Sequence, residues 1–459
     1  MMTGVSTPTK VAVAPARQCA YVVLRRVFEG GAYAEKALQG ESRELDPRDR
    51  SLAMRLTYGA VQRSGTLDHL IEQLSGRPIK RLDPPVLAAL RLGLYELLYM
   101  QGAPDYAVVG DAVELAKSGG RGGHGLVNAV LRRAGREGAQ ELLGTLSDET
   151  PEQAAILHSH PLWIARLWWD VLGAEQARAL LAADNEPGEL ALRANTLLTD
   201  SAALALELPV RTHGDPAIPE ALVLEEPYDV HDSPLWKAGA FQAQSRAAML
   251  VARALSPQPE ERVLDLCAAP GGKTTHLAAL MQGRGQILAV ESNRRRAGSL
   301  ARTVERMHAS NVRVDVADAS QPRPEGPVFD RVLVDPPCSG LGVLQARADL
   351  RWRVTPESIQ EMAALQARIL TAGAEALHPG GVLVYATCTI SPTENERLIT
   401  AFLQSNPNFV LDDLAADLPA FSMSNLAGTS ATGTASRCVL TLPHRDRTAG
   451  FFIARMRRS

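Results

Sequence analysis

From about residue 241 onward, short apolar runs rich in β-branched residues alternate with longer amphipathic segments. Runs of this kind predict buried strands, and their alternation with helices predicts a doubly wound, mainly parallel sheet. Strands are expected at 262–267, 286–291, 312–316, 329–335, 381–388 and 451–454, and helices at 242–255, 273–282, 294–308, 356–378 and 393–405. In such sheets the ligand crevice lies beyond the carboxyl ends of the strands. The residues that directly follow each run are therefore the first candidates for a functional site.

The chain before residue 150 has a different pattern, because apolar residues recur there at helical spacing without strand-like alternation. Helices are expected at 16–38, 46–74, 84–101, 105–117 and 124–137. The last of these places three apolar residues on one face and three arginines near it: Val127, Val130, Leu131, Arg132, Arg133 and Arg136. The pattern alone favours a core helix with a solvated edge. Contact of these arginines with an RNA backbone is the alternative.

The length of 459 residues allows several domains. Residues 146–240 hold 5 basic and 16 acidic residues and mix short apolar runs with Pro, Gly and Asp, which predicts an acidic linker and a small α+β module. The expected organisation is a flexible leader (1–15), an all-α domain (16–145), this middle module (146–240) and an α/β Rossmann-like domain (241–459). Residues 1–145 and residues 241–459 each carry four more basic than acidic residues, which permits a nucleic-acid partner.

Composition excludes several classes of protein. The five cysteines have no regular spacing, so neither a disulfide framework nor a structural zinc site is expected, and no metal is predicted. A reducing, cytoplasmic compartment follows most simply. The most apolar helical segment, near 86–100, contains Arg91 and Glu96, so no membrane span is expected. A monomer is expected.

The first strand of the second half runs into a glycine-rich turn, Cys267-Ala268-Ala269-Pro270-Gly271-Gly272-Lys273-Thr274. Glycines let the backbone approach a nucleotide-like ligand closely. A Walker phosphate loop is excluded because Cys267 holds the position of its first glycine, and the dinucleotide fingerprint is absent. S-adenosylmethionine remains. An acidic residue after the second strand, Glu291, would then bind the ribose, and Asp318 would contact the adenine amino group.

Two cysteines end apolar runs, Cys338 in Asp335-Pro336-Pro337-Cys338 and Cys388 in Thr387-Cys388-Thr389. Carbon 5 of a pyrimidine becomes nucleophilic when a thiolate adds to carbon 6, and this is covalent catalysis. Asp335 is placed to hydrogen-bond ring nitrogen 3. One cysteine would add to the ring and the other would assist release. Spacing alone does not decide which cysteine does which.

The segments Asp265–Thr274, Asp335–Gly340 and Tyr385–Thr389 resemble motifs of the Sun/Fmu-type RNA cytosine-5 methyltransferases, and the helical domain is similar to the NusB-like RNA-binding domain of the RsmB-like bacterial branch. The resemblance covers nearly the whole chain. It implies methylation of small-subunit (16S) ribosomal RNA, with Cys388 as nucleophile, Cys338 in product release, and Asp335 and Lys273 at the reacting centre. It also implies a set of residues at the cofactor or beside it: Cys267, Ala268, Ala269, Pro270, Gly271, Gly272, Lys273, Glu291, Asp318 and Asp335.

The RNA must present an unpaired or flipped base, because carbon 6 cannot be attacked inside a stack. Six arginines are candidates to line the RNA path: Arg294, Arg295, Arg296, Arg347, Arg351 and Arg353. For Arg294 and Arg295 a solvated helix face is at least as good an explanation. Two alternatives stay open, namely a non-catalytic RNA-binding or antitermination protein, and an enzyme whose acceptor is transfer RNA or large-subunit RNA.

Overall fold

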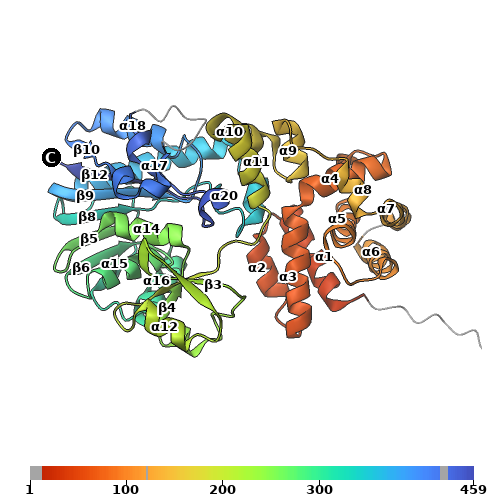
Figure 1. The fold of residues 1–459 in the computed structure, drawn as a ribbon, viewed down its shortest axis with the longest axis horizontal. Coiled ribbons are helices and arrows are strands. Elements are labelled where there is room, and N and C mark those ends of the chain that lie inside the picture. Colours follow the sequence, from red (N-terminus) through yellow and green to blue (C-terminus); the bar gives the residue numbers. More distant parts are fainter. Residues whose placement is uncertain (1–12, 120–121, 424–432) are drawn as a thin grey trace, which may run out of the picture. The chain divides into compact units, whose positions relative to one another are not determined.

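The computed structural model describes residues 13–119, 122–423 and 433–459. Most of the expected leader and part of the segment 411–436, which the sequence suggests is a flexible loop, lie outside the described residues. The chain divides into two compact units, residues 1–166 and 167–459 (Figure 1). The domain limits expected at 145 and 240 stay a prediction.

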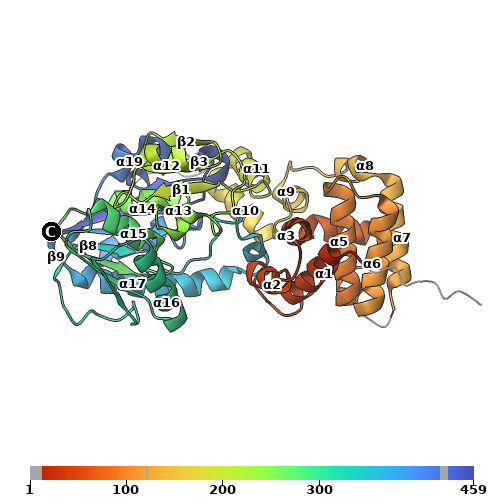
Figure 2. The same ribbon diagram turned by 90° about the horizontal axis from the view of Figure 1, so that it is seen from below.

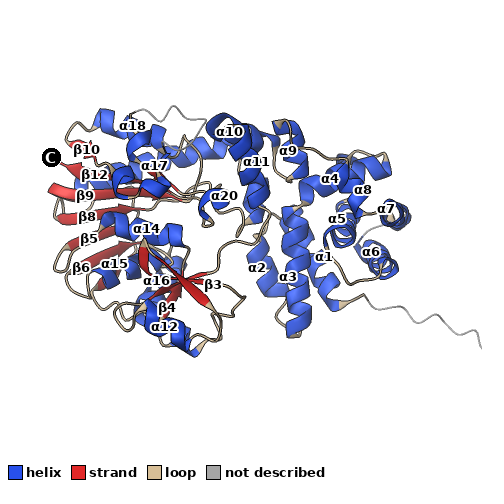
Figure 3. Cartoon of the chain, viewed as in Figure 1, coloured by secondary structure: helices blue, strands red, loops and turns tan. Residues whose placement is uncertain are grey.

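The first unit is all-helical within the described residues (Figure 3). Its helices are α1 (Pro15–Phe28), α2 (Ala34–Glu41), α3 (Pro47–Gln62), α4 (Ser64–Ser75), α5 (Pro84–Tyr99), α6 (Asp105–Gly119), α7 (His124–Glu137), α8 (Ala139–Gly144), α9 (Pro151–Leu157) and the start of α10 (Leu162–Leu172), with a short 3-10 turn at Ile79–Arg81. This confirms the all-α fold class expected for the N-terminal part.

Helix α5 is the centre of this unit and packs against α1, α3, α4, α6, α7 and α8. It is apolar on nearly every side, which is the pattern of a buried helix. Its two charges are paired inside the unit. The Arg91 guanidinium donates two hydrogen bonds of 2.7 Å to Asp68 and lies 4.1 Å from the centroid of the Phe28 ring, and Glu96 accepts from Arg17. Buried charges of this kind require such partners.

Helix α7 buries the apolar face that its sequence predicts. Val127, Val130 and Leu131 are at most 2% exposed, whereas Arg132 and Arg133 are exposed. The core helix with a solvated edge is therefore confirmed, and RNA contact by the arginines stays a prediction.

The second unit begins with the rest of α10, α11 (Ala174–Ala183) and a small α+β module. The module contains β1 (Ala191–Ala194), α12 (Ser201–Glu207), β2 (Thr212–Asp215), β3 (Ile218–Leu224), α13 (Pro234–Lys237) and β4 (Phe241–Ala243). Its antiparallel sheet has the order β2-β3-β1-β4, and α12 lies beside it in both views (Figure 1, Figure 2). The small α+β module expected in this part of the chain is confirmed.

The large sheet contains β5 (Arg262–Leu266), β6 (Gln286–Val290), β7 (Val312–Asp315), β8 (Phe329–Val334), β9 (Leu377–Thr387), β10 (Phe409–Leu411), β11 (Val439–Leu440) and β12 (Phe452–Arg458). Strands β7-β6-β5-β8-β9 are parallel neighbours. Strand β12 extends the sheet antiparallel to β9, and β10 and β11 each pair antiparallel with β12. The expected mainly parallel sheet is confirmed. Its strand order reverses between β5 and β8, where a ligand crevice is expected.

Helices cover both faces of this sheet. The helices are α14 (Arg246–Leu255), α15 (Gly272–Leu280), α16 (Arg294–Arg306), α17 (Pro356–Ala376) and α18 (Glu396–Ser405), with short helices at α19 (Leu414–Asp417) and α20 (Pro443–Asp446). Leu333 packs in one core with residues of α14 and α15, whereas Val332 and Val334 lie against Gly373 of α17. Because successive strand residues point to opposite faces, α17 covers the face opposite to α14 and α15.

A buried charge cluster joins the small module to the helix that starts at the glycine-rich turn. Glu220 of β3 accepts hydrogen bonds from Arg253 of α14 (2.9 Å) and from His276 of α15 (2.5 Å). Burial lowers the pKa of His276 to about 4. The neutral imidazole and the paired carboxylate together anchor α15 against β3.

Candidate active site at the carboxyl ends of the parallel strands

The turn after β5 brings backbone to the crevice. Strand β5 ends at Leu266, Cys267 has a φ of 66°, and Gly271 caps α15 with a φ of 106°. A Cβ added to Gly271 would lie 2.9 Å from Leu300 of α16. Glycine is therefore required at this position both by conformation and by space. The turn leaves the first N–H groups of α15 at the switch point of the sheet, where they favour an electron-rich ligand group.

Lys273 and Asp335 form an ion pair across this crevice. The distance from Lys273 Nζ to Asp335 Oδ2 is 2.7 Å, and Nζ also lies 4.9 Å from the centroid of the Phe451 ring. Burial lowers the pKa of Lys273, but the charge and hydrogen bond of Asp335 outweigh burial and leave this pKa above its ordinary value. The ammonium group is therefore charged, and it reaches Asp335 from the first turn of α15.

The two strand-end cysteines lie side by side, as the sequence expectation requires. The sulfur of Cys338, after β8, is 2.8 Å from the sulfur of Cys388, after β9. The hydrogen bond from Cys338 lowers the pKa of the Cys388 thiol, and Lys273 and Arg347 lower it further, while burial and Asp335 oppose them. The same hydrogen bond, together with burial, raises the pKa of Cys338 well above its ordinary value. The pair therefore favours a thiolate on Cys388 and a proton on Cys338.

The other three cysteines have different surroundings. Burial, with Asp335, Asp265 and Glu291 nearby, raises the pKa of Cys267 to about 12. Cys19 and Cys438 are buried, and burial raises the pKa of each. Neutral thiols of this kind behave as small apolar side chains. Cys267 thus lies near the carboxylates of the crevice without being poised as a nucleophile.

Glu291 and Asp318 have contrasting environments. Glu291, after β6, is 3% exposed, and one of its oxygens accepts from the backbone N–H of Asn293 at 2.9 Å. Its other oxygen is buried 3.3 Å from Arg296 but has no hydrogen-bond partner among the described residues. Asp318 is exposed and accepts from the backbone N–H and the hydroxyl of Ser320, which lower its pKa. Glu291 thus offers a buried acceptor to a ligand, whereas Asp318 caps its own turn.

Sequence reasoning gave no role to Asp265, which lies at the end of β5 beside the glycine-rich turn. One of its oxygens accepts from Thr274 at 2.6 Å, and the other is buried without a hydrogen-bond partner in the described parts of the chain. Burial raises the pKa of Asp265 to about 7. The sequence does mark Asp265, because it interrupts the apolar run Val263-Leu264-Asp265-Leu266. A carboxylate in a buried strand requires hydrogen-bond partners or a ligand to compensate for its burial.

One of the six candidate RNA-path arginines was placed wrongly. Arg351 is fully buried and donates to the side chain of Asn185 at 3.0 Å and to the Asp184 carbonyl at 3.1 Å. It ties the 3-10 turn Ala348–Trp352 to the end of α11 and cannot reach a phosphate. Arg347 and Arg353 flank it and are exposed, as are the three arginines at 294–296.

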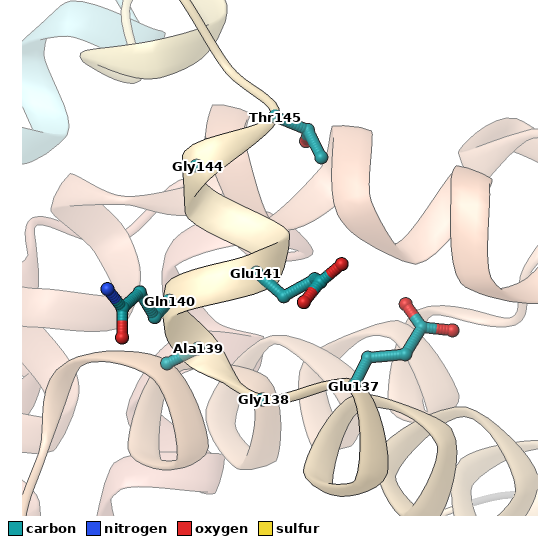
Figure 4. Close-up of a pocket in the computed structure, with 7 residues that line it drawn as sticks. All are labelled: Glu137, Gly138, Ala139, Gln140, Glu141, Gly144 and Thr145. Carbon is teal, nitrogen blue, oxygen red and sulfur yellow. The ribbon is translucent and has the colours of Figure 1, made fainter.

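Other hollows offer less chemistry. The hollow drawn in Figure 4 lies in the first unit, between α7 and α8, and is lined by Glu137, Gly138, Ala139, Gln140, Glu141, Gly144 and Thr145. Its charged side chains are both carboxylates, which would repel nucleic acid. Within the described ranges, no group of three or more His, Cys, Asp or Glu side chains is arranged to hold a metal ion, and no helix is long and apolar enough to cross a membrane.

Three family models match successive parts of the chain. Residues 14–136 match the NusB family, residues 160–231 match the ferredoxin-like domain of RsmF/B-like methyltransferases, and residues 252–457 match 16S rRNA methyltransferase RsmB/F. These three matches fall on the helical unit, the small module and the large sheet.

Curated relatives match over the full length. A probable ribosomal RNA small subunit methyltransferase B of Synechocystis is 36% identical, and the match covers 97% of this chain and 99% of the relative. Its counterpart in Bacillus subtilis is 32% identical over 96% of this chain and 98% of the relative. Among solved structures, PH0851 is 26% identical, covering 98% of this chain and 100% of that one with a TM-score of 0.77. The chain therefore belongs to the RsmB/F family of S-adenosylmethionine-dependent 16S rRNA methyltransferases.

Proposed function

We propose that this protein methylates carbon 5 of a cytosine in 16S ribosomal RNA through a covalent bond between Cys388 and the base. The observation that carries the proposal is the pair of sulfurs 2.8 Å apart at the carboxyl ends of β8 and β9, beside the Lys273–Asp335 ion pair. Methylation of an exocyclic amine needs no thiolate, because the amine is already nucleophilic. Carbon 5 of cytosine is not nucleophilic until a thiolate adds to carbon 6, so a thiolate with a neighbouring thiol fits methylation at carbon 5.

The residues around the glycine-rich turn fit S-adenosylmethionine. The Glu291 oxygen that accepts no hydrogen bond in the described residues, and that lies 3.3 Å from Arg296, would accept from the ribose hydroxyls. The turn Cys267–Lys273 would lie against the methionine portion. Asp318 is the candidate for the adenine amino group, and Asp335 lies between this turn and the cysteines. Bound S-adenosylmethionine supplies the electrophilic methyl group.

The side chains of the site divide the remaining work. The Cys388 thiolate adds to carbon 6 of the cytosine, and the electron pair of the 5,6 double bond moves toward carbon 5. The Lys273 ammonium passes a proton to Asp335 across their 2.7 Å contact, and Asp335 donates it in a hydrogen bond to ring nitrogen 3, where the negative charge of the adduct develops. After carbon 5 has gained its methyl group, a base removes the carbon-5 proton and the Cys388–carbon 6 bond breaks. Cys338 assists this release, and its proton is available to the departing thiolate.

Two observations support 16S ribosomal RNA as the methyl acceptor, namely the family match of the first unit and the names of the relatives. The N-terminal helices match the NusB family, and the curated relatives are named as small subunit methyltransferases B. Candidate phosphate contacts are exposed Arg347, whose charge lowers the pKa of Cys388, exposed Arg353, and Arg132, Arg133 and Arg136 on α7. The non-catalytic alternative is disfavoured because an inactive sheet has no need of two cysteine sulfurs 2.8 Å apart beside a buried Lys273–Asp335 ion pair.

Product analysis tests this proposal. Purified protein is incubated with methyl-labelled S-adenosylmethionine and, in parallel, with 16S, 23S and transfer RNA transcripts, and each RNA is then digested to nucleosides. We expect 5-methylcytidine from 16S RNA alone. Label in N4-methylcytidine would contradict the chemistry, whereas 5-methylcytidine from transfer or 23S RNA would contradict only the acceptor.

A further inference from the structure

Two neighbouring buried residues, Glu394 and Asn395, each hold the loop of a different cysteine. They end the turn that precedes α18 and are 0% and 1% exposed. Neither belongs to the motifs that suggested the site, and neither contacts a sulfur in the hydrogen bonds of the described residues. What they contact instead are the residues on either side of each cysteine.

The Cys338 loop is held from both sides by Glu394 and Gln366. The Glu394 carboxylate accepts from the backbone N–H of Ser339 at 2.8 Å and from the Ser339 hydroxyl. Gln366 of α17 donates to the Pro337 carbonyl at 2.8 Å and to Glu394 at 3.0 Å. The two residues that flank Cys338 are therefore fixed to one buried carboxylate and its amide partner.

The Cys388 loop is held in the same way by Asn395. The Thr387 hydroxyl donates to Asn395 Oδ1 at 2.6 Å, and Asn395 Nδ2 donates to the Thr389 carbonyl at 2.9 Å. Both neighbours of Cys388 are thus bound by the two ends of one amide. The hydroxyls of Ser339 and Thr389 lie 2.7 Å apart and join the two loops.

The two supports differ in charge. Glu394 has three neutral donors and forms no ion pair within the described ranges, so its negative charge is felt by the Cys338 thiol next to it. Negative charge nearby favours the protonated thiol. Asn395 is neutral and leaves the Cys388 thiolate to the influence of Lys273 and Arg347. The turn therefore supports opposite protonation states on its two sides.

We propose that Glu394 and Asn395 are positioning residues for separate steps, with Glu394 acting through Cys338 on release of the methylated base and Asn395 acting through Cys388 on addition to carbon 6. The inference rests on the proposed covalent mechanism. It predicts that the Glu394 variant behaves like a Cys338 variant, and the Asn395 variant like a Cys388 variant, although the two residues are adjacent in the chain.

The experiment compares Glu394→Gln, Asn395→Ala, Cys338→Ala and Cys388→Ala with wild-type protein, on 16S RNA with S-adenosylmethionine. The matched control is Glu396→Gln, two residues further on, whose side chain holds neither cysteine loop in the described hydrogen bonds. Denaturing gels report protein linked to RNA, and rapid quench separates the rate of addition from the rate of release. Where Glu394→Gln does not fold, Gln366→Met replaces it, because it removes the donor to Pro337 on the same side.

We expect Glu394→Gln to accumulate linked RNA and to slow release at least about tenfold, as for the loss of a hydrogen bond to a charged group. Asn395→Ala should slow addition about 100-fold, as for a displacement of about 1 Å, without accumulating linked RNA. Glu396→Gln should match wild type. If both variants impair the same step, or if both match Glu396→Gln, the division of roles is overturned. If neither the wild-type protein nor any variant in the comparison, Cys338→Ala included, forms a covalent link to RNA, the proposed covalent mechanism is refuted. The division of roles, which rests on that mechanism, is then refuted with it.

Discussion

Gly342 connects the loop of Cys388 to the segment that leads into β12. Its backbone N–H donates to the Cys388 carbonyl at 3.0 Å, and its carbonyl accepts from the backbone N–H of Gly450 at 2.7 Å. A Cβ added here would lie 2.0 Å from the Gly450 carbonyl oxygen, where an ordinary contact begins at 3.4 Å. The Gly450 carbonyl is part of the backbone and cannot rotate away as a side chain could. In a Gly342→Ala variant, the loop of residue 342 or the segment at Gly450 must therefore move by more than 1 Å.

The magnitude follows from that displacement. Overpacking of this kind costs about 1–3 kcal/mol of unfolding free energy. A misplacement of about 1 Å in an active site costs on the order of 100-fold in rate. We therefore expect Gly342→Ala to remain folded, to unfold at lower denaturant concentration, and to transfer methyl groups about 100-fold more slowly in a single turnover.

The matched control is Gly298→Ala on α16, where the added Cβ would lie 3.7 Å from the Arg302 side chain, an ordinary contact. Alanine in a helix interior is more favourable than glycine by about 0.5–1 kcal/mol, so this variant should be at least as stable as wild type. A Gly342→Ala protein with the wild-type rate and wild-type stability would refute the reasoning, since it would mean that the loop does not need its present contact.

Three further predictions follow from the site. Glu291→Gln should weaken S-adenosylmethionine binding about tenfold in a calorimetric titration, because a charged acceptor for the ribose is lost; an unchanged Kd would contradict the assignment. Cys338→Ala removes the hydrogen bond that lowers the pKa of Cys388, so alkylation of Cys388 should require higher pH than in wild type, and a shift to lower pH would contradict the thiolate placement. Arg351→Met should cost roughly 3–5 kcal/mol of unfolding free energy without changing the salt dependence of RNA binding, and a smaller salt slope would show that Arg351 contacts phosphate after all.

The sequence predicted the large sheet well because its strands are short apolar runs that end in turns. Strand β5 was expected at 262–267 and is Arg262–Leu266, and β8 was expected at 329–335 and is Phe329–Val334. The antiparallel partner β12 is longer than expected, since its alternating residues such as Arg455 and Arg457 hide the strand pattern, and β9 begins before its expected start. The local sequence pattern was sufficient to locate a strand wherever that strand is a single apolar run.

The site was less predictable where a side chain's role depends on distant elements. The approach of Cys338 to Cys388 could be expected because both follow neighbouring parallel strands, whereas the ion pair of Lys273 with Asp335 spans 62 residues and was not foreseen. The sequence predicts Arg351 to be a surface arginine, but it is fully buried against residues 184–185. The supports of the cysteine loops, Glu394 and Asn395, likewise depend on contacts that no local pattern encodes.

The central claim is a temporary bond between one particular sulfur and carbon 6 of a cytosine. An RNA whose target cytosine carries fluorine at carbon 5 tests this claim most directly. Release of the protein requires a base to remove a proton from carbon 5, and fluorine in place of that hydrogen blocks this step. After incubation with S-adenosylmethionine and protease digestion, mass spectrometry identifies the linked peptide. The account predicts the RNA on the peptide that contains Cys388; linkage to Cys338, or turnover on ordinary RNA with no linked peptide from the fluorinated one, would contradict it.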